Sequence, residues 1–152
     1  MGHAGMAPDT GEEMFIKGVE AVDRGDTPYG LFCLEELFEA NPAPIIASYS
    51  AVCLAKERKE FDRAIALCRD AMAEDPGNQV HYLNFGRVLV AGGRKREGIK
   101  MFRDGLLYGR NHLISRELDA LGWRKPPVFT WLRREHPLNR SLGLLFHRLG
   151  LR

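Results

Sequence analysis

Apolar side chains recur at helical spacing along the chain, and no segment shows the pattern expected of a β-strand. The first clear example is an apolar face over residues 113–121, with Asn111 as its N-cap and Gly122 as the residue that ends the helix. The second starts at Pro137 and carries an apolar stripe at Leu138, Leu142, Leu145, Phe146 and Leu149. The pattern predicts an all-α protein.

The pattern also repeats with a period of 34 residues, without gaps, over residues 11–44, 45–78 and 79–112. Small residues share two positions of this period: Gly18 with Gly86, and Gly30 with Ala64 and Gly98. A glycine inside a helix costs roughly 0.5–1 kcal/mol relative to alanine. Its recurrence therefore predicts places where two helix backbones cross closely.

Turn-forming residues divide each copy into two helices and separate one copy from the next. Gly25-Asp26-Thr27-Pro28 combines a left-handed C-cap, N-cap candidates and a proline suited to the first turn of a helix. Gly92-Gly93 breaks the third copy, and the proline-containing segments 41–44 and 75–78 separate successive copies. The chain therefore reads as a series of helix-turn-helix units.

These copies resemble the tetratricopeptide repeat (TPR), a helix-turn-helix unit with a large residue early in its first helix, small residues at the crossing and a closing proline. The middle copy carries the resemblance in Tyr49, Phe61, Ala64 and Asp75-Pro76. The third copy carries it in Tyr82, Gly86, Gly98 and Phe102, and the first, weaker copy in Met14, Gly18 and Asn41-Pro42. The resemblance implies a right-handed α-solenoid of three helix pairs.

The 34-residue period and the patterns after it divide the chain into four parts. Residues 1–10 form a flexible leader, residues 11–112 the three repeats, and residues 113–122 a capping helix. Such a cap is expected because an uncapped stack of repeats exposes its apolar face. Residues 123–152 form a linker rich in proline and aromatic residues, followed by a basic amphipathic C-terminal helix.

In the TPR family the first helices of the repeats line a concave groove that binds extended or helical peptides. The family's lining positions, transferred to this sequence, imply a largely apolar groove with one aromatic anchor and two cationic donors. The candidate peptide-binding residues are Phe15, Val19, Tyr49, Cys53, Lys56, Leu83, Arg87 and Val90. The alternative for about half of them is packing against neighbouring helices or the tail.

Some TPR proteins hold the acidic C-terminus of a chaperone in a carboxylate clamp, which needs Lys, Asn or Arg at several of these places. This chain has apolar or small residues at most of them: Phe15, Ile16, Val19, Ile46 and Ser50. Only Asn84 and Arg87 are of a suitable type. The carboxylate clamp is therefore not expected.

The formal net charge of +2 conceals a gradient along the chain. Residues 11–44 carry eight acidic and two basic side chains, residues 79–112 two acidic and seven basic, and residues 113–152 three acidic and eight basic. Such a gradient can steer an acidic partner to the C-terminal half, favour head-to-tail association, or reflect only solvated faces. Nucleic acid is not expected as a partner, because the basic cluster Arg94-Lys95-Arg96 lies in no recognised nucleic-acid-binding module.

Both tryptophans lie in the tail, beside a Pro126-Pro127 pair that favours an extended segment. The candidate interaction residues of the tail are Trp123, Phe129, Trp131, Arg133 and Arg134. Three alternatives stay open for this tail. It caps the solenoid, it pairs with another protein or a second copy, or it lies on an anionic membrane surface.

The sequence carries no motif that indicates catalysis, a cofactor or a metal site. The five histidines stand at no metal-ligand spacing with Cys or carboxylates, and there is neither a phosphate-binding loop nor a nucleophile motif. Cys33, Cys53 and Cys68 are expected to be reduced thiols packed as small apolar side chains. We therefore expect no catalytic residue, no cofactor and no bound metal.

These observations favour a non-catalytic protein-interaction module, an adaptor or scaffold, that captures a peptide or helix in the concave groove. The alternative is a membrane-peripheral adaptor that docks through its basic C-terminal segment. No stretch approaches the roughly 18 to 20 apolar residues that span a bilayer, and the start lacks a signal-peptide pattern, so a cytoplasmic location is expected. The identity of the partner and the oligomeric state stay open.

Overall fold

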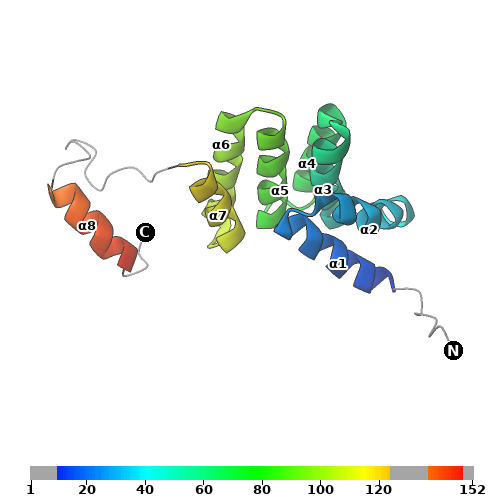
Figure 1. Cartoon of the computed structure of the whole chain (residues 1–152), viewed down its shortest axis with the longest axis horizontal. Coiled ribbons are helices and arrows are strands. Elements are labelled where there is room, and N and C mark those ends of the chain that lie inside the picture. The colour runs from blue at the N-terminus through cyan, green and yellow to red at the C-terminus, as the bar shows by residue number, and fades with distance from the viewer. Residues whose placement is uncertain (1–9, 124–136, 149–152) are drawn as a thin grey trace. The chain divides into compact units, whose positions relative to one another are not determined.

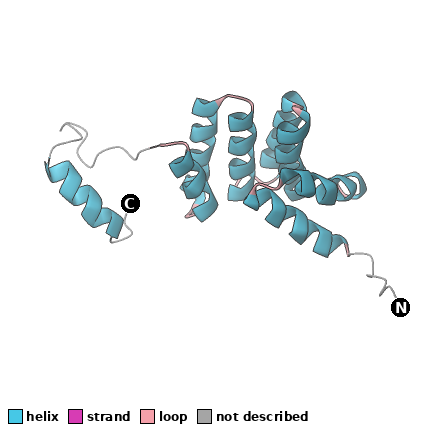
Figure 2. Cartoon of the chain, in the orientation of Figure 1, coloured by secondary structure: helices cyan, strands magenta, loops and turns pink. Residues whose placement is uncertain are grey.

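A computed structural model describes residues 10–123 and 137–148, and every regular element within these residues is a helix (Figures 1 and 2). The prediction of an all-α protein is therefore confirmed. The chain divides into two compact units, residues 1–121 and residues 122–152. The predicted leader, apart from Thr10, and most of the predicted linker lie outside the described residues.

Three helix pairs follow one another in the first unit. The first helices of the pairs are α1 (Gly11–Arg24), α3 (Pro44–Cys53) and α5 (Gln79–Ala91). The second helices are α2 (Thr27–Ala40), α4 (Phe61–Glu74) and α6 (Lys95–Gly105). The helices of each pair pack along one another, and α3 also packs on α1 and α5, so the first helices lie side by side (Figure 1).

Two short helical turns and two further helices complete the described residues. The π-helical turn η1 (Leu54–Arg58) continues α3, and the 3₁₀ turn η2 (Leu106–Tyr108) follows α6. Helix α7 (His112–Ala120) packs on α6 and overlaps the range 113–122 expected for the capping helix. Helix α8 (Pro137–Arg148) belongs to the second unit and occupies the range expected for the C-terminal helix.

The turn between the two helices of each repeat places one residue in the left-handed region of φ. Gly25 has φ of 90°, Lys59 of 59° and Gly93 of 78°, and these three residues are 34 positions apart. The left-handed turn at Gly25 is confirmed, whereas the same conformation at Lys59 was not predicted. The Nζ of Lys59 donates to the carbonyl oxygen of Lys56 at 2.7 Å, which helps to hold this turn.

Side-chain caps begin several of the helices. Thr10 and Glu13 form a reciprocal capping box at the start of α1, and Asp26 caps α2. Asn78 caps α5, and Asn111 accepts hydrogen bonds from two backbone N–H groups at the start of α7. The prediction that Asn111 is the N-cap of a helix is therefore confirmed.

The third repeat shows why glycines recur at the helix crossing. A Cβ atom added at Gly98 would lie 2.6 Å from Cγ2 of Val90 and 2.9 Å from the carbonyl oxygen of Gly86. One added at Gly86 would lie 2.3 Å from the ring of Phe102. Such distances are far below van der Waals contact, so α5 and α6 approach closely only because both residues lack a side chain, as predicted.

The core of the first unit runs through its three repeats. Its buried residues are Val22, Leu34, Tyr49, Ala51, Val52, Cys53, Ala55, Ala64, Cys68, Phe85, Val88 and Leu89. All three cysteines are buried and free, as expected from the sequence. Burial raises the pKa of the Cys53 and Cys68 thiols to about 12, so both stay protonated and pack as apolar groups.

Candidate interaction surface

The predicted groove residues all belong to the first helices of the repeats or to η1, which continues one of them. They are Phe15 and Val19 on α1, Tyr49 and Cys53 on α3, Lys56 on η1, and Leu83, Arg87 and Val90 on α5. The side chains of Tyr49, Cys53, Leu83 and Arg87 are buried, those of Phe15, Val19 and Val90 are half-buried, and that of Lys56 is exposed. Only part of the predicted set therefore offers surface to a partner.

Arg87 is engaged inside the protein. Its Nε donates to Oε1 of Glu117 on α7 at 2.8 Å, and its Nη1 donates to Oδ1 of Asp23 on α1 at 2.7 Å. The same Nη1 lies 3.3 Å from Oδ1 of Asn84, and the side chain of Arg87 is only 4% exposed. The guanidinium that was expected to orient a peptide is thus bound by side chains of three helices.

Asp23 extends this arrangement to α3. The hydroxyl of Tyr49 donates to Oδ2 of Asp23 at 3.4 Å, and Nη2 of Arg116 donates to the backbone oxygen of Asp23 at 2.8 Å. We call Asp23, Tyr49, Asn84, Arg87 and Glu117 the Arg87 cluster. It links the C-terminal end of α1 to α3, α5 and α7.

The electrostatics of the Arg87 cluster follow from its burial and its ion pairs. Burial raises the pKa of Tyr49 well above its usual value, and the Asp23 carboxylate adds to this effect. Burial by itself would lower the pKa of Arg87, but its hydrogen bonds to Asp23 and Glu117 outweigh that and raise it. The charges of Arg87, Asp23 and Glu117 are therefore paired with one another and are not available to a ligand.

The Arg87 cluster was hardly predictable from the sequence. Asp23 and Arg87 stand 64 residues apart, and Arg87 and Glu117 stand 30 apart, so no local spacing pairs them. The available sign was that a basic residue, Arg87, occupies a position expected to line the groove. Such a cation can bind an acidic side chain of another helix as well as a ligand.

A second buried polar group joins α3 to α5. The Oγ of Ser48 lies 3.1 Å from Nδ1 of His81 and 3.3 Å from Nδ2 of Asn84, and Nε2 of His81 lies 4.0 Å from Oδ2 of Asp75. A serine hydrogen-bonded to a histidine is the arrangement that activates the nucleophile in serine hydrolases. Here Ser48 and His81 are both fully buried, so a substrate cannot reach them. Within residues 10–123 and 137–148, no group of His, Cys, Asp and Glu side chains is placed to hold a metal ion.

The exposed large apolar side chain on α1 is Ile16, which is 48% exposed. It lies next to Phe15 and less than one turn before Val19, both of which are half-buried. We call Phe15, Ile16 and Val19 the α1 apolar edge. From the sequence, Ile16 was expected only to be unsuitable for a carboxylate clamp.

The candidate residues of the tail fall mostly outside the described residues. Trp123 is half-buried and ends the first described range. Phe129, Trp131, Arg133 and Arg134 lie outside the described residues. In α8, the side chains of Leu144 and Leu145 are exposed.

Residues 55–116 match the family model of the tetratricopeptide repeat. The first TPR domain of human RPAP3 is 20% identical in sequence and superposes with a TM-score of 0.55, over 74% of this chain and 89% of that one. The TPR2B domain of yeast Sti1, in its complex with pHsp70, is 24% identical with a TM-score of 0.53, over 73% of this chain and 91% of that one.

A third similar structure is the Sgt2 TPR domain of Aspergillus fumigatus, at 17% identity and a TM-score of 0.55, over 80% of this chain and 83% of that one. No curated protein matches the chain in sequence. These likenesses show the fold, three stacked helix pairs of the TPR type, and the sequence match falls on the second and third repeats. Residues 55–116 thus match the tetratricopeptide repeat family in sequence, and the chain shares its fold with solved TPR domains.

Proposed function

We propose that this chain is a non-catalytic protein-interaction module that holds a peptide or helix on the face formed by α1, α3 and α5. The observation that carries this proposal is the α1 apolar edge, where Ile16 is 48% exposed beside the half-buried Phe15 and Val19. Neighbouring apolar side chains that stay accessible on a helix are typical of binding surfaces. Burial of this edge by a partner would supply most of the affinity.

The polar side of the proposed surface is Lys56, whose side chain is exposed on η1. It replaces Arg87 as the cation that orients the ligand, because Arg87 is bound within the Arg87 cluster. A suitable partner is an amphipathic helix or an extended segment with large apolar residues and one carboxylate. Val90 on α5 is half-buried and adds to the apolar part.

The structural neighbours support a peptide as the ligand but not the chemistry of their own ligands. The first TPR of Spaghetti (RPAP3) is bound to the HSP90 peptide SRMEEVD, and the yeast Sti1 domain is in a complex with pHsp70. Here Phe15, Ile16 and Val19 are apolar at places where a carboxylate clamp needs polar or basic groups. We therefore propose a more apolar ligand than those acidic peptides.

The test starts from peptides selected on the full chain from a random library and measures their dissociation constants by fluorescence anisotropy. Ile16→Ser combined with Lys56→Glu should weaken binding by at least about tenfold, since it removes an exposed apolar contact and reverses the orienting charge. The matched control combines Leu107→Ser with Arg69→Glu, two exposed residues outside the proposed surface. An equal loss in both double variants, or none in the first, would contradict the proposal.

Tyr49 and Arg87 are not suitable for this test, although the sequence analysis placed them in the groove. Both are buried, and each contributes a hydrogen bond to Asp23. Replacing them would lower stability whether or not they contact a ligand. Surface residues separate binding from folding more cleanly.

Docking on an anionic membrane through residues 123–152 stays a prediction. None of the helices described in the structure is long and apolar enough to cross a bilayer. Cosedimentation with vesicles that contain phosphatidylserine tests surface docking, with Leu144→Ser and Leu145→Ser as the variants on α8. Vesicle binding that does not change in this double variant would contradict docking through α8. The cytoplasmic location also stays a prediction.

A further inference from the structure

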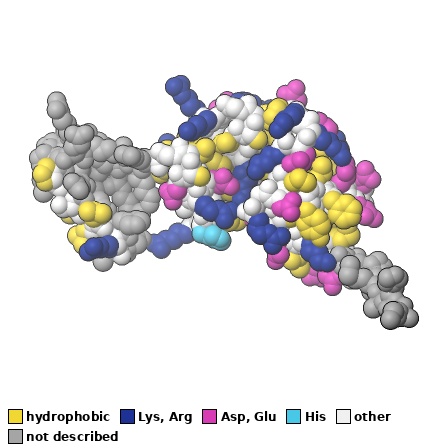
Figure 3. All heavy atoms as spheres, viewed as in Figure 1, with side chains coloured by type: hydrophobic (Ala, Val, Ile, Leu, Met, Phe, Trp, Pro, Cys, Tyr) yellow, Lys and Arg dark blue, Asp and Glu magenta, His cyan; other side chains and the backbone are white. Residues whose placement is uncertain are grey.

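The first repeat presents an exposed stripe of two aromatic and two acidic side chains on α2. Phe32 is 71% exposed and Tyr29 41% exposed, and their rings stack with centroids 6.2 Å apart. Glu36 and Glu39 follow at helical spacing on the same side of α2, and both are exposed. We call Tyr29, Phe32, Glu36 and Glu39 the α2 stripe, and Figure 3 shows apolar side chains gathered over α2 with acidic ones beside them.

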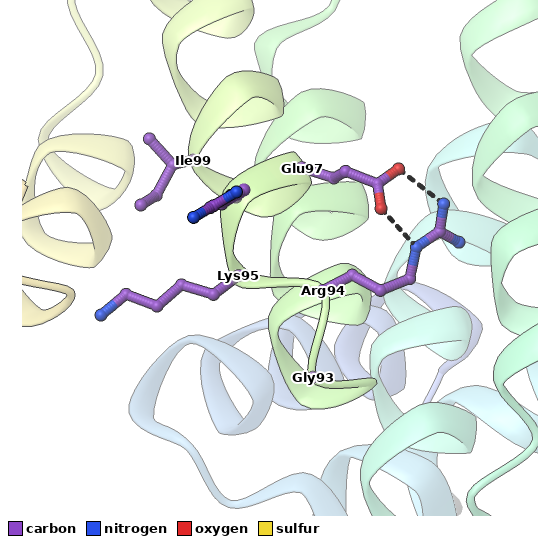
Figure 4. Close-up of a pocket in the computed structure, with 6 residues that line it drawn as sticks. Gly93, Arg94, Lys95, Glu97 and Ile99 are labelled. Carbon is purple, nitrogen blue, oxygen red and sulfur yellow. Dashed lines mark hydrogen bonds and ion pairs between the residues drawn. The ribbon is translucent and has the colours of Figure 1, made fainter.

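The third repeat presents a basic pocket at the start of α6. The pocket has a volume of about 580 Å³ and is lined by Gly93, Arg94, Lys95, Arg96, Glu97 and Ile99 (Figure 4). Arg94 is neutralised, because its Nε and Nη2 donate to the two carboxylate oxygens of Glu97 at 2.7 and 2.6 Å. Lys95 and Arg96 form no ion pair with any other residue that the structure describes, so the pocket combines two available cations with one aliphatic side chain.

Figure 4 shows how the pocket residues are divided around α6. The side chains of Lys95 and Ile99 point to one side, and the Arg94–Glu97 pair points to the other. Lys95 and Ile99 are separated by about one helical turn, or roughly 6 Å along the axis. This is the same separation as that between Phe32 and Glu36 in the α2 stripe.

The charges of the chain decide what fits this pocket. Its own tail is a poor match, because residues 113–152 carry eight basic and three acidic side chains. The first repeat, with eight acidic and two basic side chains, is the complementary part. Helices α2 and α6 belong to the first and the last repeat and do not pack on one another, so the α2 stripe does not cover the pocket of its own copy but can cover that of a second copy.

We propose that copies of this chain associate head to tail, with the α2 stripe of one copy seated on the basic pocket of the next. The two helices run antiparallel, which places Phe32 opposite Ile99 and Glu36 opposite Lys95. Phe32 supplies the apolar contact, and Glu36 and Glu39 neutralise Lys95 and Arg96. Since each copy carries both surfaces, the contact is heterologous and builds rings or linear chains of copies rather than a symmetric dimer.

The test uses two charge-neutralised full-length variants, each of which loses the charges of one of the two surfaces. Glu36→Gln with Glu39→Gln removes the acidic side, and Lys95→Gln with Arg96→Gln removes the basic side, so no swapped ion pair can form between the two variants. In sedimentation velocity at low ionic strength, the wild type should form species larger than a dimer, and each variant alone should stay monomeric. Their equimolar mixture should form a one-to-one dimer and nothing larger, because only one productive contact remains.

Two further variants make the test specific. Phe32→Ser should weaken self-association by at least about tenfold, as expected for an aromatic anchor. Asp62→Asn with Asp70→Asn, which neutralises two exposed acidic residues of α4, is the matched control and should leave self-association unchanged. A wild type that stays monomeric at every concentration, or a mixture that fails to dimerise, would overturn the proposal and leave the α2 stripe to a different protein.

Discussion

Arg87 on α5 donates a hydrogen bond to Asp23 on α1 at 2.7 Å, across 64 residues of sequence and from one end of the repeat array to the other. Through Glu117 the same guanidinium also binds the capping helix α7. The Arg87 cluster thus fastens the first repeat to the third and to the cap. It stabilises the array and at the same time withdraws a cation from the face proposed to bind peptides.

Arg87→Met is expected to lower the free energy of unfolding by about 2–4 kcal/mol, because it leaves the carboxylates of Asp23 and Glu117 half-buried without their partner. Urea denaturation followed by circular dichroism measures the change. The control is Arg63→Met, which breaks an exposed pair with Glu60 and should cost less than about 0.5 kcal/mol. Equal losses in the two variants would show that the Arg87 cluster does not hold the array together.

Lys59→Gly should stabilise the protein by about 0.5–1 kcal/mol. Lys59 has φ of 59° at the repeat position where the other two copies have glycine, and a non-glycine residue is strained there. The lost hydrogen bond from Nζ to the backbone of Lys56 is exposed and contributes little. Thermal and urea denaturation measure the gain, and a loss of stability would mean that this bond outweighs the backbone strain.

Gly98→Ala should destabilise the third repeat by about 1–3 kcal/mol. The new methyl group would overlap with Val90 and with the backbone of Gly86, and a well-packed crossing cannot make room without moving α6. Gly77→Ala is the matched control, because a Cβ at Gly77 meets nothing within 4 Å. If both substitutions had the same effect on the urea midpoint, the close crossing of α5 and α6 would not be the reason for the glycine.

The stability of the protein should fall as the pH falls below about 6.5, partly because of His81. Burial lowers the pKa of His81 below its ordinary value of 6.5, and this outweighs the opposite effect of Asp75. The unfolded chain then binds a proton at a higher pH than the folded one, so acidification favours unfolding. Urea titrations between about pH 7.5 and 5.5 should show a steeper loss for the wild type than for His81→Gln, and identical slopes would contradict this assignment.

Local features of the fold were predictable because they depend on residues close in sequence. The 34-residue period indicated the helix pairs, Gly25 and Asn111 indicated a turn and a cap, and Gly98 indicated a close crossing. These features follow from backbone sterics and the hydrogen bonds of single turns. The left-handed conformation of Lys59 was missed because a lysine does not signal it.

The interaction surface was less predictable because it depends on how far the array curves. The family's groove positions identified Tyr49, Leu83 and Arg87, but only the structure shows that packing and the bridge from Arg87 to Asp23 bury them. The exposure of Ile16 likewise depends on how the helices pack, because no helix of the described residues covers its side chain fully. The spacing of residues within one repeat does not predict contacts between the first repeat and the third repeat.

The measurement that tests the central claim most directly is a ¹H–¹⁵N NMR titration of the full chain with a selected peptide. If the face formed by α1, α3 and α5 binds the ligand, chemical shifts should change around Phe15, Ile16, Val19, Lys56 and Val90. The same peptide should leave the Ile16→Ser/Lys56→Glu variant largely unshifted. Shift changes confined to α2, α4 and α6, or a variant that responds like the wild type, would contradict the account.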